Sequence, residues 1–271
     1  MITGDFHVHT TLSTDGRSDM KEMIDAASDK GIRIICFTEH MDYDNVFGNG
    51  DEAFVVDMDA YLRSFDECRQ YAENKGVEIR FGIELGLQTY LADYYHSLAE
   101  GRPFDFIIGS SHIVRRMDCA FPTYFEAFPS VHDAVEAYFD AEVANAMCHN
   151  DFDIYGHLDY VLRYVPDEDF VFSPEEYTDS LDRLLNTLIK KEKGIEINTG
   201  GFRSRLNTSN PAPYIVRRYR ELGGTLITIG SDAHVAADLA SYFTEAEEIL
   251  KEAGFRQYAV YKNRKPEFID L

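Results

Sequence analysis

Runs of consecutive apolar residues, each of strand length, alternate along the chain with longer stretches of helical periodicity. The strand-length runs are residues 4–8, 32–38, 79–84, 106–110, 154–157, 194–198 and 226–230. The helical stretches include residues 20–30, 58–75, 131–148, 174–193, 213–222 and 236–253. Glycine directly follows several of them, at positions 31, 76, 194 and 223, as expected for helix ends. Continuous apolar strands that alternate with helices are typical of a parallel sheet.

Polar residues lie at the ends of most predicted strands, and their positions favour a barrel over an open sheet. The clusters are His7-Val8-His9, Glu39-His40, Ser111-His112, Gly156-His157 and Ser231-Asp232-Ala233-His234, and Glu84 ends one further strand. An open doubly wound sheet gathers ligands at one switch point, from two or three strands. A ligand type at six of the seven strand ends needs strands that converge on one face. The pattern therefore predicts an α/β fold with a closed or nearly closed barrel of seven strand–helix units.

The organisation of the rest of the chain is simple. There is no internal repeat, low-complexity tract or proline- and serine-rich linker, so we predict a single domain over residues 1–271. The loops at 41–54 and 115–129 are long enough to act as lids or specificity loops. The tail, residues 257–271, is predicted to add a short strand at 258–261 and a closing segment.

Imidazole and carboxylate groups at these strand ends indicate a transition-metal site. His7 and His9 lie two residues apart on a strand, so both rings can reach one ion. Glu84 ends an apolar strand, where a carboxylate needs a cation or strong donors, and its two oxygens can bridge two ions. The predicted metal ligands are His7, His9, Asp15, His40, Glu84, His112, His157, Asp232 and His234. The other histidines, His96, His132 and His149, follow no predicted strand and are expected at the surface.

The amino-acid composition indicates which binding partners and which cellular location are expected. With 26 basic and 48 acidic residues the formal charge is −22, which disfavours nucleic acid as a partner. A small anionic substrate is compatible with this charge, because bound divalent cations reverse the potential inside a site. No apolar run approaches the ~20 residues that span a bilayer. Without a secretory signal, and with four scattered cysteines of which Cys36 is expected in the core, a cytoplasmic location is predicted.

The motifs resemble a known family, the polymerase-and-histidinol-phosphatase (PHP) metallo-phosphoesterases. The matching stretches are Asp5-Phe6-His7-Val8-His9-Thr10, Ser13-Thr14-Asp15-Gly16, Phe37-Thr38-Glu39-His40, Gly82-Ile83-Glu84, Gly109-Ser110-Ser111-His112, Ile154-Tyr155-Gly156-His157-Leu158-Asp159, Glu196-Ile197-Asn198-Thr199 and Gly230-Ser231-Asp232-Ala233-His234. They run from residue 5 to residue 234 in the expected order. The length is similar to that of the stand-alone histidinol-phosphatase branch.

The resemblance implies a distorted (β/α)7 barrel that holds three divalent metal ions, of zinc, manganese or iron. It assigns the first ion to His7, His9, Glu84 and Asp232, the second to Glu84, His112 and His157, and the third to Asp15, His40 and His234. Some relatives have histidine in place of Asp15. Glu39 is expected to orient an imidazole.

Metal chemistry then indicates roles for further side chains. Paired ions lower the pKa of a water between them, which can attack phosphorus in line. Arg163 and Arg203 are the predicted phosphate ligands, with Arg205 as a competitor for the role of Arg203. The leaving alkoxide needs a proton from Asp42, Asp159 or a metal-bound water. Asp42 is alternatively a ligand for a substrate ammonium group.

The resemblance favours hydrolysis of L-histidinol phosphate to L-histidinol and phosphate in histidine biosynthesis, with another small phosphate ester, such as a nucleotide or nucleoside bisphosphate, as the alternative. Without the resemblance, the residues indicate only a metal-dependent phosphomonoesterase and no particular substrate. The charge disfavours a polymerase-associated exonuclease, and the complete ligand set disfavours a non-catalytic metal-binding protein. An amidohydrolase-type barrel would usually bridge its metals with lysine, whereas Glu84 takes that position here. Nothing in the sequence indicates an oligomeric state.

Overall fold

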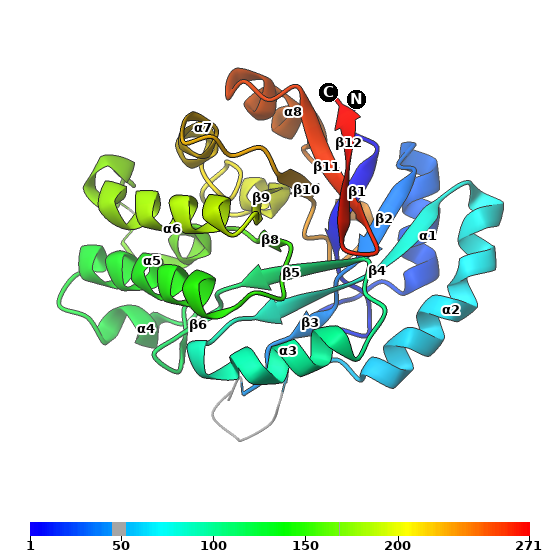
Figure 1. Cartoon of the computed structure of the whole chain (residues 1–271), viewed down its shortest axis with the longest axis horizontal. Helices are drawn as coiled ribbons and strands as arrows, with labels where there is room; N and C mark the ends of the chain where they lie inside the picture. The colour runs from blue at the N-terminus through cyan, green and yellow to red at the C-terminus, as the bar shows by residue number, and fades with distance from the viewer. Residues whose placement is uncertain (45–52, 168) are drawn as a thin grey trace.

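The computed structural model describes residues 1–44, 53–167 and 169–271, and within them parallel strands form a nearly closed barrel with helices around it (Figure 1). The strands follow one another around the barrel in chain order: β1 (Gly4–Val8), β2 (Ile34–Phe37), β4 (Glu78–Gly86), β5 (Phe106–Ser110), β8 (Ile154–Tyr155), β9 (Gly194–Asn198) and β10 (Ile227–Gly230). A short strand, β3 (His40–Met41), pairs in parallel with the end of β4. The prediction of seven strand–helix units in a distorted barrel is confirmed.

The first and last strands lie in contact, and backbone hydrogen bonds join them through the residues just beyond the end of β10. The amide of Asp232 donates to the carbonyl of His7 at 2.8 Å, and the amide of His9 donates to the carbonyl of Ala233 at 3.0 Å. The residues after β10 therefore complete the ring at its carboxyl end. Two predicted ligand segments are thus joined by backbone hydrogen bonds.

Three predicted helices have the expected bounds: α1 (Met20–Lys30), α2 (Met58–Lys75) and α5 (Val131–Cys148). Their ends carry strong signals, such as the capping box of Asp19 and Glu22 and the left-handed Gly31 with φ 73°. The remaining longer helices are α3 (Ala92–Glu100), α6 (Thr178–Lys190), α7 (Pro213–Glu221) and α8 (Phe243–Glu252).

Two predicted helices are shorter than expected. The stretch 174–193 begins with a 3-10 turn, Pro174–Tyr177, before α6. The stretch 236–253 is split between a 3-10 turn, Ala236–Asp238, and α8, because Ala240 and Tyr242 have positive φ of 52° and 59°, which an α-helix excludes. The loop 115–129 contains further structure that was not predicted, the short helix α4 (Pro122–Glu126) and the hairpin strand β7 (Met117–Asp118), which pairs with β6 (Ile113–Val114).

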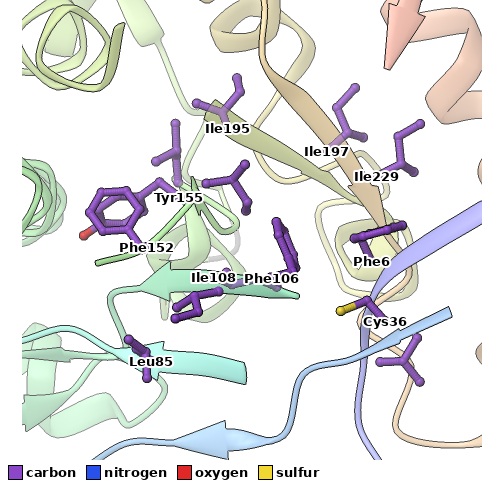
Figure 2. Close-up of a cluster of buried hydrophobic side chains, with 14 of the residues drawn as sticks. Phe6, Cys36, Leu85, Phe106, Ile108, Phe152, Tyr155, Ile195, Ile197 and Ile229 are labelled. Carbon is purple, nitrogen blue, oxygen red and sulfur yellow. The ribbon is translucent and has the colours of Figure 1, made fainter. Parts of the chain in front are cut away.

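Buried apolar side chains from the barrel strands form a hydrophobic cluster (Figure 2). Phe6 of β1 and Phe106 of β5 meet edge to face at 5.3 Å, and Ile108, Ile195 and Ile197 are fully buried. Full burial of each such side chain contributes roughly 1.5–3 kcal/mol. Cys36 lies in this core, as predicted.

A carboxyl-terminal hairpin covers the amino ends of the strands. Its strands are β11 (Gln257–Lys262), which contains the predicted strand 258–261, and β12 (Lys265–Asp270). Arg264 at its turn donates to Asp153, just before β8, at 2.6 Å, and the amide of Asn263 donates to Asp105, just before β5. In Figure 1 the hairpin lies beside β1. The opposite end of the barrel, where the polar clusters lie, stays free of it.

The three histidines expected at the surface do not all lie there. The side chains of His96 and His132 are largely exposed, as predicted. The prediction was wrong for His149, which is buried at the end of α5, with Nε2 3.0 Å from the carbonyl of Gln88. No helix in the described part of the chain has the length and apolar character needed to cross a membrane.

Candidate metal centre

The nine predicted ligands lie together at the carboxyl ends of the strands. His7, His40 and Glu84 belong to strands β1, β3 and β4, and the others follow strand ends within a few residues: His9 and Asp15 after β1, His112 after β5, His157 after β8, and Asp232 and His234 after β10. Four sets of three donor atoms lie within 4.8 Å of one another: His9, His40 and His234; His7, His9 and Asp232; His7, Glu84 and His157; and His40, Glu84 and His112. Because these sets share members, the donors form one continuous cluster.

The first predicted ligand group has spacings suited to one ion. His7 Nε2 lies 3.4 Å from Glu84 Oε1, and His9 Nε2 lies 3.5 Å from Glu84 Oε2. Asp232 Oδ1 lies 3.7 Å from His7 Nε2 and 3.6 Å from His9 Nε2. A tetrahedral zinc ion with bonds of about 2.0–2.1 Å places neighbouring donor atoms about 3.4 Å apart.

Three donor atoms of this group are not used in hydrogen bonds within the described part of the chain, although His40 Nδ1 lies 2.8 Å from Glu84 Oε2. His7 Nε2, His9 Nε2 and Glu84 Oε2 are buried and have no hydrogen-bond partner among the described residues. An unpaired buried polar atom is costly, by about 1–3 kcal/mol, and three of them converging on one point fit a bound cation. The residues present therefore fit a metal ion.

The second group surrounds Glu84 Oε1, the oxygen that also faces His7. His157 Nε2 lies 3.0 Å from Glu84 Oε1, and His112 Nε2 lies 3.5 Å from the same oxygen. The two imidazole nitrogens are 3.4 Å apart. Glu84 thus lies between two groups of donors, where a bridging carboxylate would lie.

The third group is more open to solvent. His40 Nε2 lies 3.5 Å from His234 Nε2, and Asp15 approaches them at 3.7 and 3.1 Å. The side chain of Asp15 is 43% exposed and that of His234 is 26% exposed, whereas Glu84 is completely buried. The turn of Asp15 needs Gly16, since a Cβ there would lie 1.8 Å from the carbonyl of Thr10.

Further polar side chains hold the ring nitrogens that face away from the centre. Glu196 Oε1 lies 2.7 Å from His7 Nδ1, and Asp42 Oδ2 lies 2.8 Å from His112 Nδ1. Such carboxylate partners orient an imidazole and increase its basicity. Glu39, expected to orient an imidazole, accepts a hydrogen bond from Ser13 at 2.5 Å, and Ser13 Oγ in turn lies 3.4 Å from His9 Nδ1.

The role of Glu196 was missed from the sequence, although its motif was recognised. It lies in the apolar strand β9 between two isoleucines and is fully buried. This is the same signal that pointed to Glu84, a carboxylate inside an apolar strand.

The electrostatics of the cluster keep its carboxylates charged. Burial opposes ionisation of Glu84, but the neighbouring His7, His112 and His40 outweigh it and hold the pKa of this carboxyl well below its ordinary value. Burial likewise opposes ionisation of Asp232, and the neighbouring His7 and Arg163 lower its pKa. Burial, together with the charges of His40 and His234, lowers the pKa of His9. A neutral imidazole is the form that binds metals.

Two ligand positions have unusual backbone conformations. Asp232 has φ 54° and His157 has φ 22°, both in a region that residues with a side chain rarely adopt. Such conformations cost roughly 1–3 kcal/mol each and cluster at functional sites. Asp5 steadies the first of these segments by accepting from the amide of Ser231 at 2.9 Å.

The two predicted phosphate-binding arginines differ in position. Arg163 lies at the edge of the cluster and donates to Asp232 Oδ2 at 3.3 Å and to Asn198 Oδ1 at 3.0 Å. Arg203 donates to the carbonyls of Ser231 and Asp232 at 2.8 and 2.9 Å, so it supports the segment after β10. Arg205 is exposed and donates to the carbonyl of Asp167.

The two carboxylates predicted as proton donors are both buried. Asp42 is held against His112, with its second oxygen unpartnered among the described residues. Asp159 accepts from Asn210 Nδ2 at 2.5 Å and from the amide of Ala212 at 2.8 Å. Burial raises the pKa of Asp159 to about 6, against these hydrogen bonds.

A parallel barrel whose strand ends converge on a shared carboxylate, surrounded by imidazoles, is an arrangement typical of metal-dependent hydrolases of the barrel class. The chain belongs to the PHP domain family, whose model matches residues 5–200. It is 33% identical to a probable histidinol-phosphatase from Clostridium acetobutylicum, over 93% of this chain and 94% of the relative. It is 28% identical to the histidinol-phosphatase of Lactococcus lactis, over 96% and 95%.

A solved structure supports the same family assignment. The crystal structure of histidinol phosphate phosphatase from Lactococcus lactis, in complex with zinc, L-histidinol and phosphate, matches with a TM-score of 0.89 and 27% identity. The match covers 98% of each chain. The family resemblance inferred from the motifs is therefore confirmed.

Proposed function

We propose that this protein is a metal-dependent phosphomonoesterase that hydrolyses L-histidinol phosphate to L-histidinol and phosphate. The observation that carries the chemistry is the position of Glu84, whose two oxygens are both surrounded by imidazole nitrogens. Oε1 faces His7, His112 and His157 at 3.0–3.5 Å, and Oε2 faces His9 at 3.5 Å and His40 at 2.8 Å. The substrate is inferred from relatives that match this chain over nearly their full length and are named histidinol-phosphatase or probable histidinol-phosphatase.

We propose three ions, divided among the ligands as the family resemblance implies, and the donor atoms of each group lie close enough together to share an ion. His7, His9, Glu84 and Asp232 would hold the first, Glu84, His112 and His157 the second, and Asp15, His40 and His234 the third. When bound, such ions supply Lewis acidity and a nucleophile active near neutral pH. Zinc, manganese and iron are all compatible with nitrogen and carboxylate donors.

The protein's own groups have separable roles in this proposal. Arg163 has the position to hold a phosphate oxygen beside Asp232, as a guanidinium favours. Arg203 acts through the segment that carries Asp232, and Asp42 acts through His112. The proton for the leaving alkoxide would come from Asp159 or from water.

The remaining proposals concern the whole molecule. Residues 1–271 would work as one domain, and a chain of formal charge −22 would take a small phosphate ester rather than nucleic acid. We expect a location in the cytoplasm.

Phosphate release from a substrate panel tests the function. Histidinol phosphate, nucleoside phosphates and nitrophenyl phosphate would be compared, with Zn²⁺, Mn²⁺ and Fe²⁺ supplied in turn. We expect the highest kcat/KM for histidinol phosphate and about three metal ions per chain in protein purified without chelator. Preference for a nucleotide would leave only the phosphoesterase class, and activity that persists in metal-free protein would overturn the proposal.

A further inference from the structure

A cluster of polar side chains lies buried behind the second ligand group, and no role has been assigned to it. Helix α5 brings Tyr138 and Asn145, seven residues apart and so on one face of the helix, against Ser111. Tyr155 of β8 reaches Ser111 from another direction. We call these four residues the Ser111 cluster, and each of them is almost completely buried.

Every member of the cluster is joined by hydrogen bonds. Asn145 Nδ2 donates to Ser111 Oγ and to the carbonyl of Leu87, each at 2.9 Å. The Tyr138 hydroxyl donates to the carbonyl of Ser111 at 2.9 Å, and the Tyr155 hydroxyl lies 2.6 Å from Ser111 Oγ. Both the side chain and the carbonyl of Ser111 are therefore held.

The segments joined in this way are those that carry the second ligand group. Leu87 lies three residues after Glu84, Ser111 directly precedes His112, and Tyr155 lies two residues before His157. The amide of Leu87 also donates to the carbonyl of Ser110 at 2.7 Å, which ties the first two segments together again.

The polar character of the cluster is not needed for packing. Most other buried positions of α5, such as Val135, Phe139 and Val143, are apolar, and Glu142 is the exception. A satisfied polar network in a low-dielectric interior holds a defined geometry, whereas apolar packing tolerates small shifts. Ligand atoms must keep their spacing within a few tenths of an ångström to bind a metal tightly.

We propose that Asn145 is a positioning residue for the second metal ion, with Tyr138 in support. Asn145 joins the segment after Glu84 to the segment before His112. Tyr155 joins the segment before His157 to Ser111, so the three ligands are held at a fixed spacing. This inference rests on the proposed function, since it concerns the affinity of one of the three proposed ions.

The test uses Asn145→Leu, which keeps the approximate volume and removes both hydrogen bonds, and Tyr138→Phe, which removes one. The matched control is Tyr124→Phe. The Tyr124 hydroxyl is equally buried and donates to the carbonyl of Ala134 of α5 at 2.8 Å, but it does not contact the Ser111 cluster. Zn²⁺ affinities are measured by competition with a chromophoric chelator, and unfolding by urea is measured for each protein.

We expect Asn145→Leu to weaken one of the three ions about tenfold, the low end of effects from groups around metal ligands, with the other two within about twofold. Tyr138→Phe should weaken the same ion by a smaller factor. Tyr124→Phe should lower the urea midpoint without changing any metal affinity.

The outcomes separate this inference from the proposed function. If the unmodified protein binds no metal, the proposed function itself fails. If it binds three ions and neither Asn145→Leu nor Tyr138→Phe changes any affinity, or if all three weaken equally, the positioning role is wrong. If Asn145→Leu does not fold, Tyr138→Phe compared with Tyr124→Phe decides.

Discussion

His7 and Glu196 meet at the centre of the barrel, with His7 Nδ1 2.7 Å from Glu196 Oε1 and both side chains out of contact with solvent. They come from β1 and β9, on either side of β10 in the ring of strands. Burial opposes protonation of His7, but the charge of Glu196, followed by those of Glu84 and Asp232, holds its pKa well above the ordinary value. Glu196 therefore fixes both the orientation and the electron density of a predicted ligand.

Glu196→Gln should weaken metal binding at the first group by about 10–100-fold, because the amide lacks the charge that makes His7 a strong donor. The measurement is a chelator competition that resolves the ions. Asp153→Asn is the matched control, since Asp153 is also a buried carboxylate with hydrogen-bond partners but lies at the amino end of β8, away from the predicted ligands. Equal metal affinities in Glu196→Gln and the unmodified protein would show that this contact is structural only.

The ligand groups should release their ions in order of exposure. Glu84 is inaccessible to solvent, whereas Asp15 is 43% exposed, so a chelator should remove the third ion first. Asp15→Ala should lose that ion alone. The metal content should then fall by about one third, and kcat should fall by a larger fraction. Glu84→Ala should loosen both buried ions and reduce kcat by several orders of magnitude, because the shared ligand of the hydrolytic pair is gone.

Metal content after gel filtration and steady-state kinetics decide this prediction. Two retained ions in Asp15→Ala, against one or none in Glu84→Ala, is the expected pattern. A Glu84→Ala protein with normal kcat would refute the bridging assignment.

The sequence predicted the site better than it predicted the elements between strands. All nine expected ligands converge. The alternation of apolar strands with helices predicts a parallel barrel, and residues at the carboxyl ends of its strands all lie on one face. The break at Ala240 and Tyr242 was not predicted, since left-handed conformations at residues other than glycine depend on tertiary contacts. The burial of His149 has the same origin: its partner is the carbonyl of Gln88, which is 61 positions away in sequence.

The orientation of side chains around the ligands was also beyond sequence reasoning. Asp42 follows His40 closely, yet it reaches His112, which lies just after β5. Arg203 follows β9 but holds the segment after β10. Such partners depend on the angle at which each loop leaves its strand, which no local pattern encodes.

Glu142 should make the protein less stable as pH rises. Its carboxyl is buried, and burial, followed by the nearby charge of Asp159, raises its pKa well above the ordinary 4.5, against an opposing contact with the Tyr138 hydroxyl. Below that value both folded and unfolded chains hold the proton. Above it the unfolded chain releases the proton while the folded chain keeps it, so unfolding becomes progressively easier.

Glu142→Gln removes this titration. The variant should match the unmodified protein below about pH 4.5 and exceed it in unfolding free energy by up to about 1.4 kcal/mol for each further pH unit, until the pKa of the folded state is reached. Urea unfolding across pH measures the difference, and Glu252→Gln, at an exposed position, is the control. A constant difference across pH would mean that Glu142 is charged in the folded protein.

The two interpretations of Asp42 make opposite predictions for substrate choice. If Asp42 binds the substrate ammonium group, Asp42→Asn should reduce kcat/KM for histidinol phosphate much more than for nitrophenyl phosphate, which has no amine. If it orients His112, as its 2.8 Å contact with Nδ1 indicates, both substrates should lose about 10–100-fold, mainly in kcat, because the metal-binding ring is shared by every reaction. We expect the second result, together with weaker binding of the second ion.

Arg163→Ala serves as the comparison, since the loss of a phosphate ligand should raise KM for both esters alike. A selective loss of histidinol phosphate hydrolysis in Asp42→Asn, with metal affinity unchanged, would assign this carboxylate to the substrate instead.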